Sequence, residues 1–176
     1  MDVVASPSSP ALAPFVDVLW YVETRAPHGR QRVLPSGEMQ LLVNLGKDEL
    51  RSEHGATMRR VSGAALQGAC DEPVAIDTAD LETIVGVAFR PGGAYAFFPA
   101  PASATRGDLV DLDALWGRPG ALLRERLLEA ATPAEKLLEL ETALLAQAIR
   151  PLSPDHARAF AVAALDRGVA VASVAD

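Results

Sequence analysis

Hydrophobic and polar residues alternate along residues 38–45, which is the pattern of a β-strand whose two faces differ in chemistry. One face carries only apolar side chains, those of Met39, Leu41, Val43 and Leu45. The other face is mixed and carries Glu38, Gln40, Leu42 and Asn44. If the apolar face fills a core, the mixed face either lies in solvent, as in an ordinary antiparallel sheet, or lines a ligand pocket.

Further short strands are predicted on both sides of this segment. Residues 15–23 also alternate, with one apolar face made of Val16, Val18, Trp20 and Val22. Pro35-Ser36-Gly37 is a turn signal, and residues 74–77 and 82–90 supply two more strands. Several short strands at roughly ten-residue spacing predict a small antiparallel barrel or sandwich.

The pattern changes to that of helices after about residue 93. A short helix is predicted over residues 112–116 and a longer one from about 119 to 131. A third helix opens with a capping box, in which Thr132 is the N-cap and Glu135 its partner. Strands followed by helices predict an α+β fold.

A fourth helix is predicted from Asp155 to Gly168, where glycine has its usual role at a helix C-terminus. Residues 169–176 then begin another apolar helix and stop in its first turns. We therefore expect four parts in the chain. They are a flexible lead-in over 1–14, a β domain over 15–100, a helical linker over 101–151 and the beginning of a further helical module over 152–176.

The chain is acidic, since 23 Asp and Glu residues against 16 Lys and Arg residues give a formal net charge of -7. Affinity for nucleic acid comes largely from Lys and Arg that neutralise phosphates, so these residues by themselves are not expected to bind DNA. A hydrophobic share of 49% and a charged share of 22% are typical of a soluble globular protein. The sequence lacks a signal-peptide pattern and an apolar run of the roughly 18–20 residues that cross a membrane. With a single cysteine, it predicts a cytoplasmic location.

No catalytic or metal-binding pattern is apparent in the sequence. The histidines His28, His54 and His156 are far apart, and CxxC pairs, a GxSxG elbow and a Walker loop are absent. Cys70 has acidic neighbours, which disfavour a reactive thiolate. We therefore expect a protein that is not an enzyme and that carries no metal and no cofactor.

The mixed face of residues 38–45 is the candidate ligand-binding surface, unless it is merely in contact with water. Residues 82–90 offer an opposite wall, because Gly86 and Ala88 leave room on the face that carries Arg90. An arginine opposite a carboxylate and an amide suits a small polar or anionic molecule. The candidate ligand-binding residues are Glu38, Gln40, Asn44, Arg90 and Tyr21.

Leucines at helical spacing within residues 133–149 form a second candidate surface, for dimerisation. They are Leu137, Leu140, Leu144 and Leu145. A leucine stripe serves a partner helix or the core of its own domain equally well, so the sequence leaves both interpretations open.

Three motifs, "RVLPSGEMQLLVNLG", "GVAFRPGGAYAFF" and "LVDLDALWG", occur in this order within roughly residues 15–150. Together they resemble the sensor half of a group of AraC-family bacterial transcription regulators. The segment "DHARAFAVAALDRGVAVASVAD" is similar to the start of that family's helix-turn-helix module for binding DNA. The resemblance implies a cupin-like β-barrel or sandwich as the sensor, a linker for dimerisation over 101–151 and a helix-turn-helix module begun over 152–176.

The resemblance also implies a function, which is the ligand-sensing and dimerisation half of a transcription regulator. The implied partners are a small-molecule effector, a second copy of the chain and DNA, with no membrane. DNA would be contacted by a recognition helix that lies outside these residues. The alternatives are a stand-alone cupin-like protein that binds a small molecule, or an enzyme of that shape, and a protein-interaction module that uses the leucine stripe.

Overall fold

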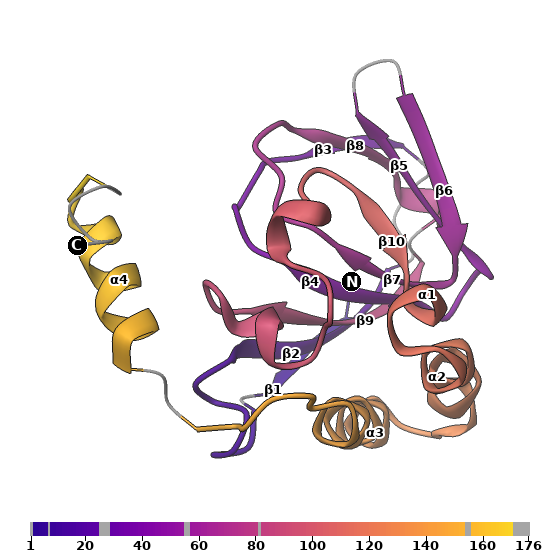
Figure 1. The fold of residues 1–176 in the computed structure, drawn as a ribbon. Coiled ribbons are helices and arrows are strands. Elements are labelled where there is room, and N and C mark those ends of the chain that lie inside the picture. The colour runs from indigo at the N-terminus through magenta and orange to yellow at the C-terminus, as the bar shows by residue number, and fades with distance from the viewer. Residues whose placement is uncertain are drawn as a thin grey trace.

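The computed structural model describes residues 2–6, 8–24, 29–54, 57–80, 82–153 and 156–170. In this part of the chain ten strands form two antiparallel sheets, and four α-helices follow, which makes the fold α+β (Figure 1). The sheets do not close into a barrel. Of the two expected architectures, the sandwich is therefore the one that forms.

Sheet A, the larger sheet, has six strands in the order β1-β2-β9-β4-β7-β10. Each neighbouring pair is antiparallel. Its strands are β1 (Asp2–Ser6), β2 (Val16–Glu23), β4 (Gln40–Asn44), β7 (Ala64–Gln67), β9 (Thr83–Phe89) and β10 (Leu109–Asp111).

Sheet B has four strands in the order β3-β8-β5-β6. Its edge strand β3 is exposed along its whole length. The strands are β3 (Arg30–Val33), β5 (Glu49–His54), β6 (Thr57–Ser62) and β8 (Val74–Asp77).

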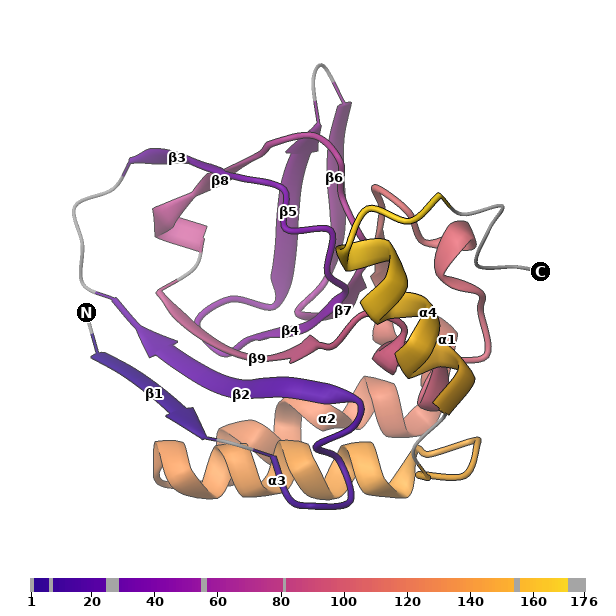
Figure 2. The ribbon, with the colours of Figure 1, turned by 90° about the vertical axis from the view of Figure 1, so that its left-hand side faces the viewer.

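The helices cover the face of sheet A that points away from sheet B. Figure 2 shows the three layers, with sheet B uppermost, sheet A in the middle and the two long helices beneath. The fourth helix lies apart from these layers in Figure 1. The α-helices are α1 (Leu112–Trp116), α2 (Arg118–Glu129), α3 (Pro133–Ala146) and α4 (His156–Asp166), and the 3-10 helices are η1 (Thr78–Asp80), η2 (Gly93–Ala96) and η3 (Ala102–Ala104).

The main core lies between sheet A and the helices. Apolar side chains of β2, β4, β7 and β9 meet leucines of α2 and α3 there. Aromatic rings close one end of this core, where Trp116 stacks on Phe98 with ring centroids 5.2 Å apart and its indole N–H donates to the Phe97 carbonyl oxygen at 2.9 Å. A smaller apolar cluster lies on the opposite face of sheet A, toward sheet B. Sheet A is therefore the central layer, with different surroundings on its two faces.

The local signals at the helix ends are confirmed. The Thr132 side chain accepts a hydrogen bond from the Glu135 backbone N–H, and the Glu135 carboxylate accepts one from the Thr132 backbone N–H. These bonds satisfy donors that the first turn of α3 leaves free. Gly168 has a φ of +79°, which is the left-handed conformation expected after α4.

The structure corrects the expected domain boundaries at two places. The lead-in over 1–14 contains β1, which pairs with β2 from Asp2 to Ser6, so these residues belong to sheet A. The helical linker over 101–151 contains β10, which pairs with β7. Both are edge strands, whose pairing depends on a distant partner rather than on their own sequence. The last six residues, 171–176, lie outside the described part of the chain.

A β-bulge also corrects the expected alternation of residues 15–23. The register with β9 shifts between Val16 and Val18. Val16 therefore lies in the core on the helix side, whereas Trp20 faces sheet B. An extra residue in one strand is the usual cause of such a change of face.

Candidate functional site

The face of sheet A that points toward sheet B carries side chains in regular rows. In one row Trp20 of β2 lies beside Gly86 of β9, and Gly86 beside Leu42 of β4. In the next row Gln40 of β4 is paired with Gln67 of β7. Side chains at directly paired positions share a face of the sheet. The mixed face predicted from the sequence therefore points into the sandwich and not into open solvent.

A cavity of about 280 Å³ lies between the two sheets. Apolar side chains from both sheets form most of its wall, with polar groups among them. Mostly apolar walls with a few polar groups are typical of small-molecule sites. The lining residues are Trp20, Val22, Val33, Leu34, Pro35, Ser36, Glu38, Gln40, Leu42, Leu50, Arg51, Ser52, Gln67, Gly68, Cys70, Val74, Ile76, Ile84 and Leu109.

The indole of Trp20 forms part of the cavity wall because Gly86 has no side chain. A Cβ on Gly86 would come within 2.4 Å of Trp20 Cζ2 and 2.7 Å of Cε2. The ring therefore lies against the backbone of β9. An aromatic ring placed in this way offers a flat apolar surface on which another ring stacks.

The amide of Gln67 and the thiol of Cys70 form a polar corner of the cavity. The side-chain amide of Gln67 donates to the sulfur of Cys70 at 3.1 Å and to the Asp108 carbonyl oxygen at 3.2 Å. Burial, and next the neighbouring Asp71 carboxylate, raise the pKa of the Cys70 thiol above its ordinary value, while the hydrogen bond from Gln67 opposes this shift. Cys70 is therefore a neutral thiol at neutral pH and not a reactive thiolate.

Ser52 contributes a hydroxyl from the opposite wall. It alternates along β5 with the charged residues Glu49, Arg51 and Glu53, and it shares one face of that strand with Leu50, which also lines the cavity. Only 4% of Ser52 is exposed, and its Oγ has no hydrogen-bond partner in the described part of the protein. A buried hydroxyl without a partner costs free energy on the order of 1–3 kcal/mol, so Ser52 is a lining residue with unused hydrogen-bonding capacity.

The connection between β3 and β4 forms one side of the cavity. Leu34 and Val33 in this region are 75% and 47% exposed, although both are apolar. Ser36 and Glu38 of the same connection are also lining residues. Exposed apolar side chains beside a cavity favour the entry of a partly apolar molecule.

Of the five predicted ligand-binding residues, the cavity brings Glu38 and Gln40 together and leaves out the other three. Tyr21 lies on the opposite face of β2, in the core on the helix side, and its hydroxyl donates to the Glu23 carboxylate at 3.0 Å. Neighbouring residues of a strand point to opposite faces, so Trp20 takes the place that the prediction gave to Tyr21.

Asn44 is fully buried and has a structural role. Its side-chain amide donates to the Glu49 carbonyl oxygen at 2.9 Å, and its Oδ1 accepts from the backbone N–H groups of Gly46 and Lys47 at 3.0 Å each. These bonds fix the turn between β4 and β5. The prediction that Asn44 binds a ligand is therefore not supported, because its donors and acceptors already serve this turn.

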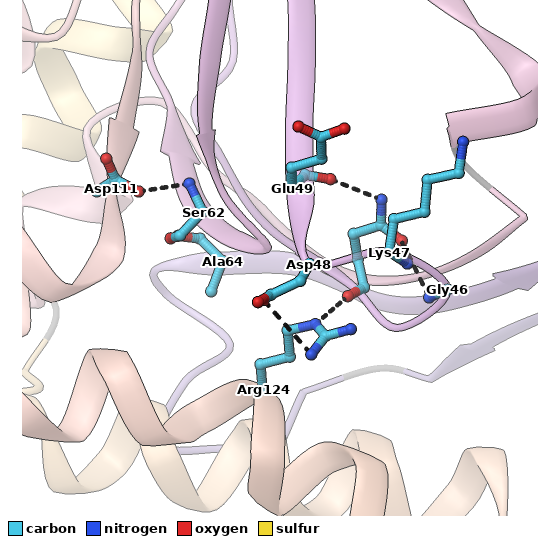
Figure 3. A network of polar contacts seen from close by, with 9 residues as sticks. Gly46, Lys47, Asp48, Glu49, Ser62, Ala64, Asp111 and Arg124 are labelled. Atoms are coloured by element: carbon cyan, nitrogen blue, oxygen red, sulfur yellow. Dashed lines mark hydrogen bonds and ion pairs between the residues drawn. The ribbon is translucent and has the colours of Figure 1, made fainter.

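Arg124 joins the same turn to α2. Its Nε donates to the Asn44 carbonyl oxygen at 2.7 Å, and its Nη1 lies 3.5 Å from the Asp48 carboxylate. Figure 3 shows this side chain rising from α2 toward Asp48. Gly63 leaves room for it, since a Cβ there would lie 2.7 Å from Arg124 Cδ. The turn after the cavity strand β4 is thus connected directly to a helix.

Arg90 lies outside the cavity, which corrects the expectation that it faces Glu38 and Asn44 across a pocket. Its Nε donates to the Ala13 carbonyl oxygen at 2.9 Å, and its Nη2 lies 3.3 Å from the Asp17 carboxylate. Arg90 and Glu38 do line a second hollow of about 420 Å³, outside the space between the sheets. The cation needed for a small anionic ligand is therefore not on the wall that the sequence predicted.

The leucine stripe is mainly intramolecular. Leu137, Leu140 and Leu144 are buried in the core against sheet A, with exposures of 4%, 0% and 0%. Leu145 is 40% exposed and is the member of the predicted set that a partner can still reach. The structure therefore favours the intramolecular interpretation for three of the four residues.

The sequence prediction missed Trp20, Ser52 and Gln67 as cavity residues. A signal for Ser52 exists, because charged and uncharged residues alternate from Glu49 to Glu53, which predicts a strand with two different faces. For Trp20 the signal is weaker, since it requires knowing that β2 pairs with the strand that contains Gly86.

In the described part of the chain no group of three or more His, Cys, Asp or Glu side chains is arranged to hold a metal ion. None of the described helices has the length and apolar character needed to cross a membrane.

Comparison with known proteins places the chain in one family. No curated protein and no solved structure gives a significant match. A family model described as "Domain of unknown function (DUF6597)" matches residues 5–111. The match runs from within β1 to the last residue of β10, and thus covers both sheets and the cavity between them. Because it covers more than half of the 176 residues, the chain belongs to the DUF6597 family.

Proposed function

We propose that this chain is the effector-binding part of an AraC-type transcription regulator, and that its effector is a small molecule bound between the two sheets. The observation that carries the proposal is the cavity itself, with apolar walls from both sheets and the buried Ser52 hydroxyl, which has no hydrogen-bond partner among the residues that the structure describes. In this proposal the chain binds a ligand and does not catalyse a reaction.

A route from the cavity to the helices supports a sensing role. Gln40 and Leu42 line the cavity from β4, while the intervening Leu41 packs in the core on the helix side. The carbonyl oxygen of Asn44, at the end of the same strand, accepts the hydrogen bond from Arg124 of α2. A ligand that shifts β4 therefore acts on α2. Such a ligand changes the state of the helices if it binds one arrangement more tightly than the other.

The regulator part of the proposal rests on the three sequence motifs and on α4. The helix α4 (His156–Asp166) follows the helical segment that contains α2 and α3, at the place where the resemblance puts the first helix of a DNA-binding module. DNA contact is assigned to a recognition helix outside the described residues. A second copy of the chain would provide the second DNA-binding module. A cytoplasmic location is part of this proposal, because the regulator must reach DNA.

A thermal-shift screen tests whether the cavity binds small molecules. We expect some members of a panel of neutral aromatic and aliphatic compounds to raise the melting temperature of the wild-type protein in a concentration-dependent way. Leu42→Trp, which fills the cavity, should abolish the shift. The matched control is Leu138→Trp on the exposed face of α3, which should leave it intact. Val74→Phe fills the cavity from sheet B and serves if Leu42→Trp does not fold.

A DNA-binding experiment tests the regulator separately. The full-length gene product that contains this chain is mixed with fragments from the region upstream of its own coding sequence, and bound DNA is sequenced. We expect specific fragments to be retained and a bound compound from the screen to change their affinity. Ligand binding without any DNA binding would overturn the regulator and leave a stand-alone small-molecule-binding protein.

A further inference from the structure

The chemistry of the cavity wall restricts the class of ligand, an inference that rests on the proposed function. The uncharged part of the wall has three main kinds of group. They are apolar side chains from both sheets, the indole of Trp20, and uncharged polar groups contributed by Ser52 and the paired Gln40 and Gln67.

The charges around the cavity argue against an anionic ligand. Arg51 is the cation among the described lining residues, and its guanidinium is hydrogen-bonded to the carboxylate of Glu49. Glu38 adds a negative charge at the β3–β4 connection. A carboxylate or phosphate placed inside would lose its hydration and meet the like charge of Glu38, and the one cation among the described lining residues, Arg51, already binds Glu49.

The volume sets the size of the ligand. An apolar cavity of about 150 Å³ holds one benzene ring. The cavity here, at about 280 Å³, is nearly twice as large. By that ratio it accommodates on the order of a dozen non-hydrogen atoms.

Trp20 and Ser52 restrict the shape and the polarity of the ligand. Trp20 presents a ring that rests on the backbone of β9 and lies on the opposite face of sheet A from the aromatic cluster around Phe98. Stacking against such a ring favours a flat ligand. The buried Ser52 hydroxyl can both donate and accept, and it has no hydrogen-bond partner among the described residues, so it can bind a polar group of the ligand.

We propose that the ligand is an uncharged, flat, amphipathic molecule of about a dozen non-hydrogen atoms. Its ring stacks on Trp20, and one hydroxyl, carbonyl or ring nitrogen forms a hydrogen bond with Ser52. The amides of Gln40 and Gln67 face the polar edge of this molecule.

Calorimetric titration of the protein with two probes of the same skeleton tests this class. The probes are 2-naphthol, which is neutral at pH 7, and 2-naphthoate, which is an anion. We expect 2-naphthol to bind at least about tenfold more tightly, because the carboxylate has to be desolvated without a partner. Equal or tighter binding of 2-naphthoate would overturn the assignment to neutral ligands, while the cavity would remain a binding site.

Ser52→Ala provides the second measurement, with Ser103→Ala on the exposed surface as the matched control. We expect Ser52→Ala to weaken 2-naphthol binding by roughly three- to tenfold, the effect of one hydrogen bond, without lowering the melting temperature of the free protein. A merely structural serine would give the reverse result, a less stable protein with unchanged affinity. Failure of both probes to bind would overturn the proposed ligand class, and the compound panel then decides independently whether the cavity binds any ligand.

Discussion

The indole of Trp20 occupies the space that a side chain on Gly86 would need, so that a Cβ there would come within 2.4 Å of Trp20 Cζ2. The two residues are directly paired neighbours on β2 and β9. Their contact creates the flat part of the cavity wall. It also explains why the ring lies against its own sheet and leaves the space between the sheets open.

Gly86→Ala should therefore push the Trp20 ring into the cavity. The new methyl group would also come 2.9 Å from the Leu41 carbonyl oxygen, which cannot move freely. We expect the free energy of unfolding in urea to fall by about 1–3 kcal/mol and small-molecule binding to be lost. Gly46→Ala is the control, since its Cβ would make only ordinary contacts at 3.6 Å or more. An unchanged affinity in Gly86→Ala would show that Trp20 does not shape the site.

Asn44→Ala should destabilise the protein rather than act on binding alone. The substitution removes one donated and two accepted hydrogen bonds from a fully buried residue. We expect a loss of about 2–4 kcal/mol in the free energy of unfolding, because buried backbone groups of the turn lose their partners. Normal stability combined with lost ligand binding would instead make Asn44 a ligand-binding residue.

The leucines of α3 separate a core role from a dimerisation role. Leu144→Ala should lower the free energy of unfolding by about 2–5 kcal/mol, because Leu144 is fully buried. Leu138→Ala, at a position that is 64% exposed, should change it by less than about 0.5 kcal/mol. Sedimentation of the two variants and of Leu145→Ala then measures whether each protein is a monomer or a dimer. A shift from dimer to folded monomer in Leu144→Ala would contradict the intramolecular role.

Cys70 provides a native probe of the cavity, because it is the single cysteine of the chain. Its raised pKa means that alkylation by iodoacetamide should be slow at neutral pH and should rise with a midpoint above that of the unfolded protein. The folded thiol holds its proton more tightly, so its contribution to stability is complete below the unfolded pKa and is lost as the pH rises through the folded pKa. A bound ligand should slow the reaction further. A midpoint at or below that of the unfolded chain would contradict the buried, neutral thiol.

Local signals in the sequence predicted most of the secondary structure. The strand over 74–77 and the capping box at Thr132 were found, because turn residues and caps act over a few positions. The alternation of residues 38–45 correctly separated the buried Leu41 and Val43 from the cavity residue Gln40. These features depend on neighbours in the sequence.

The remainder of the site depends on pairing between distant strands, which no local pattern specifies. The alternation of residues 82–90 puts Arg90 on the same face as Ala88. The chain leaves sheet A at that point, however, and the guanidinium binds Asp17 and the Ala13 carbonyl oxygen instead. The bulge beside Val16 likewise became visible only through the register with β9. Position along a strand predicts on which face of the sheet a side chain lies, whereas the topology decides what that face packs against.

The central claim is that a small molecule binds between the sheets, beside Trp20. The chain has two tryptophans, and their indole N–H signals in a ¹H–¹⁵N spectrum report on the two faces of sheet A separately. Trp20 lines the cavity, whereas the Trp116 indole is held by the Phe97 carbonyl in the core on the other face. On titration with 2-naphthol, we predict that the Trp20 signal shifts to saturation and that the Trp116 signal stays within a small fraction of that change. An unmoved Trp20 signal at saturating 2-naphthol, or equal shifts of both signals, would contradict binding in this cavity.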